Sequence, residues 1–566
     1  MARFALLFAL LLAGCTGGGS LGNDDDVAND DDAANDDDAA NDDDLADDDD
    51  AVGVDCGEDI PSAPGRVHTT GGVYDGDEID GVWQFLGVPF AEAPVGDLRF
   101  AAPAPYACRD EQPFAANQWP AWCPQLDDED AVVGDEDCLH LNVWTPATLP
   151  DPTERLPVLV FIHGGGNIQG SASVGGDSYT LYGGPELTGR TDVVAVTLQY
   201  RLGALGFFAH EDLPALNLGL RDQQVALEWV RDNIAAFGGD PDRVMLFGES
   251  AGAVNTCMHI ASPGSAGLFD AALMQSGGCG ARTREVAESE GTTYADELGC
   301  GGDLLGCLRS TSVDDLVTLN GDAFTGGTAG GGGFGPVVDG DVLPEQPIER
   351  IEAGAHNAVP FIVGANSDET SRTVPLGVPT AAQYPNLLAS RFGGFADLVE
   401  DEYPLSDFPT ARDAWVRLTT DAQFVCPSRA IARAMVAGQA EPVRRYFFTQ
   451  SPAGVAGDTY GAWHGVELVY VWNKIAAVEA DSGWTSDASD RAVEEAAGNA
   501  WANFAADGDP NGPTFGLPLP ATWPEFGDEG DDDHYLELGE VIGVGQGVRT
   551  DKCDFWDALL ELVSGG

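Results

Sequence analysis

Short apolar runs alternate with amphipathic stretches through most of the chain. The runs at 156–162 (LPVLVFI), 193–198 and 243–247 predict buried strands, and 223–237 has the spacing of an amphipathic helix. A helix between two strands predicts a mostly parallel sheet flanked by helices, an α/β fold. The stretch 360–364 predicts a further strand. The segment 282–335, which ends in a glycine-dominated run, is expected to be a surface insertion.

One serine follows a predicted strand in a pattern typical of hydrolases. Ser250 is the central residue of the pentapeptide 248–252 (GESAG), directly after the strand at 243–247. Glycines two positions before and after it permit the sharp strand-to-helix turn that exposes a nucleophilic hydroxyl. In a chain with 73 glycines the pentapeptide alone is a weak signal, so its surroundings decide its meaning.

A second glycine-rich turn follows the strand at 156–162. Residues 163–166 (HGGG) leave backbone N–H groups free to approach a ligand closely. Together with the N–H of Ala251, such a turn is what an oxyanion hole needs. A plain glycine turn is the alternative interpretation, and the pairing with the serine turn favours the oxyanion hole.

A serine nucleophile needs a histidine base, which follows it in the chain order of this hydrolase architecture. His464 is favoured because glycine flanks it and apolar residues follow, which predicts a loop over the core. His259 is expected on the helix that leaves the serine turn. His356 precedes most of the acid candidates, and His534 is expected in a solvated acidic loop.

The base in turn needs an acidic residue that orients it. Asp368 and Glu369 both follow the predicted strand at 360–364, at the strand end where catalytic residues of open α/β sheets gather. Asp339 is a third candidate. The residues alone leave all three open.

Seven segments in this order resemble the type-B carboxylesterase family. They are 136–144 (EDCLHLNVW), 163–166, 217–223 (NLGLRDQ), 247–252, 275–277, 364–369 and 463–467. The resemblance covers roughly 67–560 and implies one α/β-hydrolase domain with long insertions, not two modules. It implies hydrolysis of a small-molecule carboxylic ester by a serine esterase without a cofactor.

Site residues follow from the resemblance position by position. It implies Ser250 as nucleophile, Glu369 and not Asp368 as acid, and His464 as base. It also implies that the oxyanion donors are the backbone N–H groups of Gly165, Gly166 and Ala251.

The chain also departs from the family pattern. The residue after the acid is Thr370 where the family usually has glycine, and 371–373 carry no gorge aromatics. A cation–π cage for choline is therefore not expected, whereas Arg372 suggests tolerance of an anionic group. A catalytically silent adhesion module of the same fold is the alternative from another class, and hydrolysis of carbamates or amides is the alternative chemistry. No HExxH, paired CxxC or EF-hand pattern predicts a metal site.

The N-terminal residues predict export and a lipid anchor. A basic start and a nine-residue apolar stretch make 1–14 a signal peptide, and LAGC resembles the bacterial lipobox, with Cys15 lipidated. The repeat NDDDxA lies within the expected disordered tether at 15–55, and 56–566 forms the esterase domain. The expected location is extracytoplasmic, with membrane contact only through the lipidated N-terminus.

Eleven cysteines include Cys15 and ten others. Because export favours disulfides, pairing is expected among the ten. The resemblance implies the pairs Cys123–Cys138, Cys300–Cys307 and Cys426–Cys553. Elimination then suggests Cys56–Cys108 and Cys257–Cys279, with free buried thiols an equal alternative for the last pair.

The formal net charge is −68, and the chain stays strongly acidic without the sixteen aspartates of the repeat. Such a surface excludes nucleic acid as a partner, since phosphates demand Lys and Arg. It is typical of proteins in high salt, where screening weakens self-repulsion, and a role in solubility is the alternative.

Overall fold

A computed structural model describes residues 60–108, 113–127, 129–148, 154–176, 179–324, 333–482, 484–512, 518–527 and 533–564. The strands of the main sheet are β3 (Asp77–Ile79), β4 (Val82–Pro89), β8 (His140–Pro146), β9 (Leu156–Ile162), β12 (Val194–Leu198), β13 (Gly239–Glu249), β14 (Ala271–Gln275), β15 (Phe361–Asn366), β16 (Val443–Phe448), β17 (His534–Leu538) and β18 (Gly543–Gln546). Short ladders outside it are formed by β1 (Arg66–Thr69), β2 (Gly72–Asp75), β5 (Phe114–Ala115), β6 (Gln125–Leu126), β7 (Val132–Val133), β10 (Gly175–Gly176) and β11 (Tyr179–Thr180).

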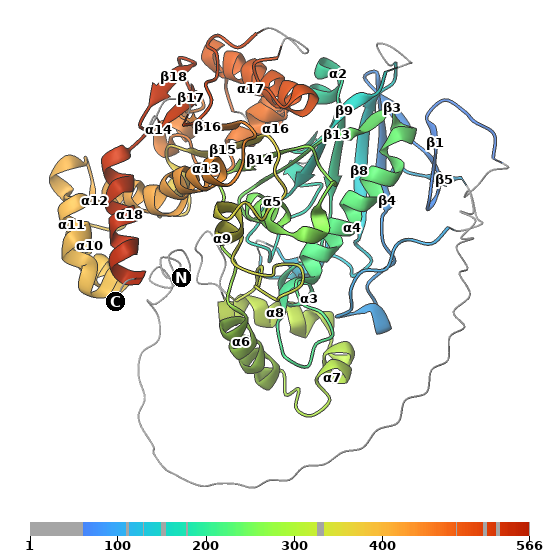
Figure 1. Cartoon of the computed structure of the whole chain (residues 1–566), viewed down its shortest axis with the longest axis horizontal. Helices are drawn as coiled ribbons and strands as arrows, with labels where there is room; N and C mark the ends of the chain where they lie inside the picture. The colour runs from blue at the N-terminus through green and yellow to red at the C-terminus, as the bar shows by residue number, and fades with distance from the viewer. Residues whose placement is uncertain are drawn as a thin grey trace.

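Within the described residues the main sheet has eleven strands in the order β18-β17-β16-β15-β14-β13-β9-β12-β8-β4-β3 (Figure 1). The strands from β17 through β12 are parallel to their neighbours, and antiparallel strands complete both edges. Parallel neighbours bring the carboxyl ends of β9, β13, β14 and β15 to one edge of the sheet, which is where ligands bind in open α/β folds.

Helices cover both faces of the sheet, and further helices lie beyond it. They are α2 (Pro185–Thr191), α3 (Gly203–Phe207), α4 (Leu218–Asn233), α5 (Ala251–Ala261), α6 (Arg284–Glu297), α7 (Leu304–Ser310), α8 (Val313–Phe324), α9 (Pro347–Glu352), α10 (Tyr384–Phe392), α11 (Ala396–Glu402), α12 (Ala411–Thr420), α13 (Cys426–Gly438), α14 (Val455–Tyr460), α15 (Glu467–Val471), α16 (Ile475–Ser482), α17 (Ala488–Asp507) and α18 (Thr550–Ser564). The core under α4, α5, α9 and α13 lies on one face, and the core under α2, α15 and α17 lies on the other.

Strand β9 shows why the sequence forms a doubly covered sheet. All seven of its residues are buried. Val158, Val160 and Ile162 belong to the core under α4 and α5, whereas Leu159 and Phe161 belong to the core under α17. Because successive side chains of a strand point to opposite faces, a strand covered on both sides must be apolar throughout.

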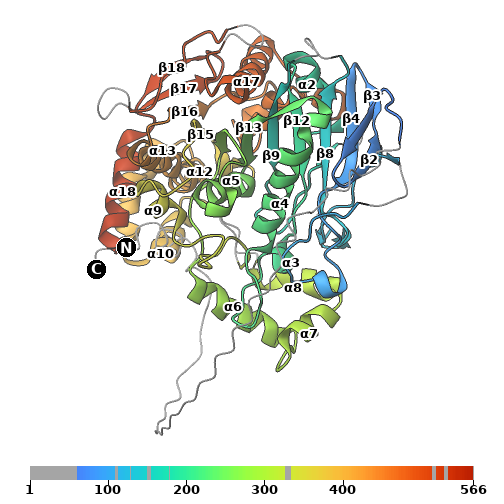
Figure 2. The same cartoon turned by 45° about the vertical axis from the view of Figure 1, so that its right-hand side comes forward.

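A third cluster of buried residues joins α10, α11 and α12 to the C-terminal helix α18. Figure 1 shows these four helices together at one end of the molecule, and Figure 2 again shows α10 beside α18. Between α12 and α13 the helix winds more widely through one π-helical turn, η7 (Asp421–Val425). Such turns are rare and occur often at functional sites.

The predicted strands are present with small changes at their ends. Strand β13 begins four residues earlier than expected because Gly239 already pairs with Leu156 ahead of a register shift. Helix α4 begins at Leu218 and ends at Asn233, and a 3-10 turn completes the expected stretch to Phe237. In the described part of 282–335, α6 and α7 leave most of their residues outside the core and bury one face, with residues such as Tyr294, against the main core.

Four disulfides lie within the described residues, which is typical of proteins that fold in an oxidising compartment. They join Cys123 to Cys138, Cys257 to Cys279, Cys300 to Cys307 and Cys426 to Cys553. Cys108 is also disulfide-bonded. Cys15 and Cys56, with the whole of 1–59, lie outside the described residues.

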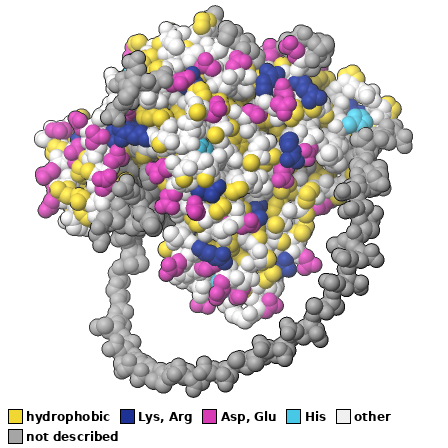
Figure 3. Space-filling model, in the orientation of Figure 1, with side chains coloured by type: hydrophobic (Ala, Val, Ile, Leu, Met, Phe, Trp, Pro, Cys, Tyr) yellow, Lys and Arg dark blue, Asp and Glu magenta, His cyan; other side chains and the backbone are white. Residues whose placement is uncertain are grey.

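Acidic side chains are spread over the face seen in Figure 3 and do not gather at one patch. No helix in the described ranges is long and apolar enough to cross a membrane.

Candidate functional site

Ser250 lies in a strained turn between β13 and α5. Its backbone has φ 58° and ψ −122°, a conformation that L-residues rarely adopt. The flanking glycines are required by close contacts. A Cβ on Gly252 would come 2.0 Å from the carbonyl oxygen of Ile162, and one on Gly248 would come 2.4 Å from Gly252. The turn therefore holds the serine at the carboxyl end of β13.

The glycine loop after β9 lies directly against this turn. A Cβ on Gly164 would come 3.0 Å from the Cβ of Ser250. Gly165 and Gly166 have φ 106° and 66°, and their N–H groups, like that of Ala251, donate to no other residue among those described. His163 anchors the loop, because its ring stacks on Tyr200 and its carbonyl accepts the Tyr200 hydroxyl at 3.0 Å. Three unused donors thus lie beside the serine turn.

His464 and Glu369 form a close polar contact in the site. His464 Nδ1 lies 2.6 Å from Glu369 Oε2, and the other oxygen of this carboxylate accepts the backbone N–H of Asn366 at 2.7 Å. The side chain of Glu369 is fully buried and that of His464 is 29% exposed. The ring of Phe424, from the π-helical turn η7, lies 5.0 Å from the imidazole. The imidazole is therefore oriented from two sides.

The two other acid candidates serve different purposes. Asp368 Oδ2 accepts the hydroxyl of Ser367 at 2.5 Å and the N–H of Ala462 at 3.4 Å, so this carboxylate holds the loop that precedes His464. Asp339 Oδ1 accepts two backbone N–H groups of its own turn, and its Oδ2 lies 3.9 Å from Arg221. Of the three candidates, Glu369 is the one hydrogen-bonded to His464.

The other three histidines downstream of Ser250 are occupied elsewhere. His259 is buried in α5 between Ser265 and Gln223, and burial lowers its pKa to about 3. His356 contacts Gln439. The expectation of a solvated loop for His534 is wrong, because this residue begins β17 and pairs with Gln546 of β18.

Two further buried carboxylates surround His464, and the sequence analysis gave neither a role. Glu249, the residue before Ser250, places Oε1 3.2 Å from His464 Nε2. Glu467 accepts the side-chain amides of Gln275 at 3.1 Å and Asn366 at 2.5 Å. In the sequence, their nearness to the site is indicated only by their positions. Glu249 directly precedes Ser250, and Glu467 follows His464 by three residues.

Electrostatics couple these groups. Burial raises the pKa of Glu249 to about 7. The His464 cation acts against this rise, and the negative charge of Glu369 adds to it. Burial, with the charges of Glu249 and Glu369, raises the pKa of Glu467 to about 8. Burial alone would lower the pKa of His464, but Glu249 and Glu369 outweigh it and the pKa rises to about 10. The pocket therefore stabilises an imidazolium.

The hydroxyl of Ser250 and the imidazole of His464 are not hydrogen-bonded to each other. Nε2, the ring nitrogen opposite Glu369, faces the carboxylate of Glu249 instead. Catalytic hydrogen bonds are often long without a substrate and tighten when one binds. The site thus combines an oriented histidine with a serine in a strained turn.

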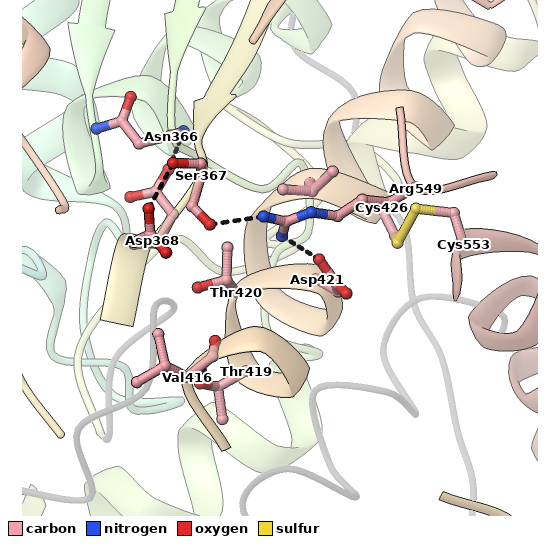
Figure 4. Close-up of polar contacts among 12 residues, drawn as sticks. Asn366, Ser367, Asp368, Val416, Thr419, Thr420, Asp421, Cys426, Arg549 and Cys553 are labelled. Atoms are coloured by element: carbon pink, nitrogen blue, oxygen red, sulfur yellow. Dashed lines mark hydrogen bonds and ion pairs between the residues drawn. A yellow bond between two sulfur atoms is a disulfide. The ribbon is translucent and has the colours of Figure 1, made fainter. Parts of the chain in front are cut away.

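A second polar network holds the acid loop from the C-terminal side (Figure 4). Arg549 donates to the carbonyl of Ser367 at 2.6 Å and pairs with the fully buried carboxylate of Asp421. Asp421 begins η7, the turn that carries Phe424. The disulfide Cys426–Cys553 fastens the end of this turn to α18.

Comparisons with known proteins identify the family of this chain. The model of the carboxylesterase family matches residues 63–556. This chain belongs to the carboxylesterase family. It is a carboxylic ester hydrolase of the α/β-hydrolase fold.

The individual relatives are esterases and related hydrolases. Acylcarnitine hydrolase of Mus musculus is 33% identical over 89% of this chain and 92% of its own length, and cocaine esterase of Homo sapiens is 33% identical over 85% and 88%. Pyrethroid hydrolase Ces2e of Rattus norvegicus is 34% identical over 86% and 87%. The solved structure of PNB esterase superposes with a TM-score of 0.75 at 30% identity and covers 87% of this chain and 99% of its own.

Proposed function

We propose that this carboxylesterase acts through an acyl-enzyme on Ser250, with His464 as base and Glu369 as the acid that orients it. The observation that carries the proposal is the 2.6 Å contact between Glu369 and His464 beside a serine in a strained turn. A buried carboxylate on Nδ1 fixes the tautomer in which Nε2 can accept a proton, and it stabilises the cation that forms.

The reaction has two balanced halves. His464 takes the hydroxyl proton of Ser250 as the oxygen attacks the ester carbonyl, and the oxyanion accepts N–H groups of Gly165, Gly166 and Ala251. Each such donor contributes about 3–4 kcal/mol to stabilisation of the transition state. The imidazolium gives its proton to the leaving alcohol, and water repeats the sequence on the acyl-enzyme.

The test is hydrolysis of p-nitrophenyl butyrate by the full chain. We expect Ser250→Ala to abolish turnover, and a fluorophosphonate to label Ser250 in the wild type alone. Ser276→Ala is the matched control, because Ser276 directly follows β14, also has a left-handed φ of 55°, and its buried hydroxyl has no partner among the described residues. Retention of turnover in Ser250→Ala would refute the proposal. A wild type that is folded but inactive on all esters would favour the adhesion alternative.

We also propose that the enzyme is a lipoprotein held outside the cytoplasm by Cys15, with 15–55 as its tether. Forty residues from Thr16 to Asp55 reach at most ~130–145 Å when fully extended. An alkyne-tagged palmitate should label the wild type in the cells that produce it and leave Cys15→Ser unlabelled, and the variant should leave the membrane fraction. Equal labelling of both proteins would contradict the anchor.

A further inference from the structure

Arg372 is an exposed arginine on the loop that follows Glu369. Its guanidinium centre lies 5.3 Å from the ring centroid of Trp463 and 6.0 Å from that of Tyr460. Trp463 immediately precedes His464 in the chain. The cation therefore joins the two segments that supply the proposed acid and base.

The backbone beneath this arginine is firmly held. The hydroxyl of Ser371 donates to the carbonyl of Tyr460 at 2.6 Å. The buried guanidinium of Arg412 donates to the carbonyls of Ser371 and Val374, one on each side of Arg372. The loop is thus fixed to both neighbouring segments, and the guanidinium is positioned before any ligand arrives.

The donors of this guanidinium are free. No carboxylate or carbonyl of the described residues forms an ion pair or hydrogen bond with Arg372, although the chain carries a net charge of −68. The hydroxyl of Tyr460 likewise has no partner among the residues that the structure describes. Stacking on aromatic faces uses the face of the guanidinium and leaves its N–H edges available to an anion.

The neighbouring histidine indicates which part of a substrate would meet these donors. In the proposed mechanism His464 protonates the leaving alcohol, so the alcohol portion of the ester lies next to this residue. Trp463 and His464 are adjacent in the chain, so the segment that carries the proposed base also carries the ring on which the Arg372 guanidinium stacks. The length of the spacer between the leaving oxygen and a carboxylate is therefore the variable that the test must span.

We propose that Arg372, with the hydroxyl of Tyr460, binds a carboxylate on the alcohol portion of the ester. This inference rests on the proposed function, because it uses the role of His464 to orient the substrate. Arg372 is a specificity-determining residue and takes no part in bond breaking. Esters of hydroxy acids and carboxyphenols are the substrate class that it favours.

The test uses matched anionic and neutral acetate esters with the full chain. The anionic set is 4-acetoxybenzoate, 4-acetoxyphenylacetate and 3-(4-acetoxyphenyl)propanoate, and each is paired with its carboxamide. The measured quantity is the ratio of kcat/KM for the acid to that for the amide. This ratio cancels changes in folding or in the chemical step, which affect both esters equally.

We expect Arg372→Gln to lower this ratio about tenfold for the ester of best-fitting length, because a charge-assisted contact is lost. The ratio for Arg372→Lys should lie between those of the wild type and Arg372→Gln, because lysine keeps the charge and lacks the planar fork of the guanidinium. Arg231→Gln is the control, an exposed arginine of α4 paired with Asp232, and it should leave the ratio unchanged. Raising the salt concentration from 0.1 to 1 M should reduce the ratio in the wild type and have little effect in Arg372→Gln.

A ratio within twofold of the wild type in Arg372→Gln, for all three lengths, would overturn the inference while leaving the esterase intact. So would an effect confined to a carboxylate on the acyl side, measured with p-nitrophenyl hemiglutarate against p-nitrophenyl valerate. If neither the wild type nor any variant hydrolyses the neutral acetate esters that carry a carboxamide, the proposed function is refuted instead.

Discussion

Loss of Arg549 should destabilise the enzyme far more than loss of an arginine at the surface. Arg549 pairs with Asp421, whose side chain is completely buried, and its own side chain is 10% exposed. In Arg549→Gln the Asp421 carboxylate keeps the hydroxyl of Tyr403 at 3.1 Å as a partner and loses its counter-charge. Removing one member of a buried pair costs about 3–5 kcal/mol, because the other charge stays buried.

The control and the double variant isolate this cost. Arg433 pairs with the half-exposed Asp557 at 3.3 Å and is 47% exposed itself, so Arg433→Gln should cost about 1 kcal/mol or less. Adding Asp421→Asn to Arg549→Gln removes the unpaired charge and should recover part of the loss. Urea unfolding followed by tryptophan fluorescence suits this region, since Trp556 donates to Tyr403 at 2.9 Å.

The loss should also depend on pH. Burial already raises the pKa of Asp421 against the opposing charge of Arg549, and removing Arg549 raises it further. A carboxyl whose pKa is higher in the folded state binds protons preferentially in that state, so its penalty is absent at low pH and grows as pH rises. The defect of Arg549→Gln should therefore be smaller at pH 5 than at pH 8. A defect equal to that of Arg433→Gln, or one independent of pH, would refute this reasoning.

Three further perturbations test the site and its frame. Glu467→Gln removes a carboxylate that helps to raise the pKa of His464. Because the imidazole must be neutral to accept a proton, the acidic limb of the kcat/KM profile should move to lower pH, and an unmoved limb would contradict the coupling. Gly252→Ala puts a Cβ 2.0 Å from the carbonyl oxygen of Ile162, so activity towards p-nitrophenyl butyrate should be lost, and near-normal activity would contradict the close packing. Replacing Cys426 and Cys553 by serine opens a 127-residue loop, and the same change at Cys300 and Cys307 opens a 7-residue loop. Loop entropy predicts costs of about 5 and about 2 kcal/mol, and equal shifts in urea midpoint would exclude that explanation.

The strands nearest the site were predictable because burial on both faces leaves a simple signal. The apolar run 156–162 coincides with β9, and Val194–Leu198 of β12 differs by one residue from the expected strand. The turns at Ser250 and at the glycine loop also have a local signal in the sequence, because a sharp turn needs glycine at fixed positions.

The choice between Asp368 and Glu369 could not be made from local pattern. Both residues follow β15, and only the folded loop turns one carboxylate towards His464 and the other towards Ala462. Residues that act across large sequence separations gave no signal at all. Arg549 and Asp421 are 128 positions apart, and nothing near either residue indicates the contact.

The charges around the site explain why substrate choice should be decided at Arg372 and not at the reacting atoms. Glu249, Glu369 and Glu467 favour an imidazolium on His464, which helps every ester in the transition state, because each forms that cation. The same carboxylates oppose any substrate anion that comes near them. Arg372 places an unshared positive charge on the ring of Trp463, the residue before His464. Under the two proposals, an anionic ester is expected to bind with its carboxylate at this arginine and its carbonyl at Ser250.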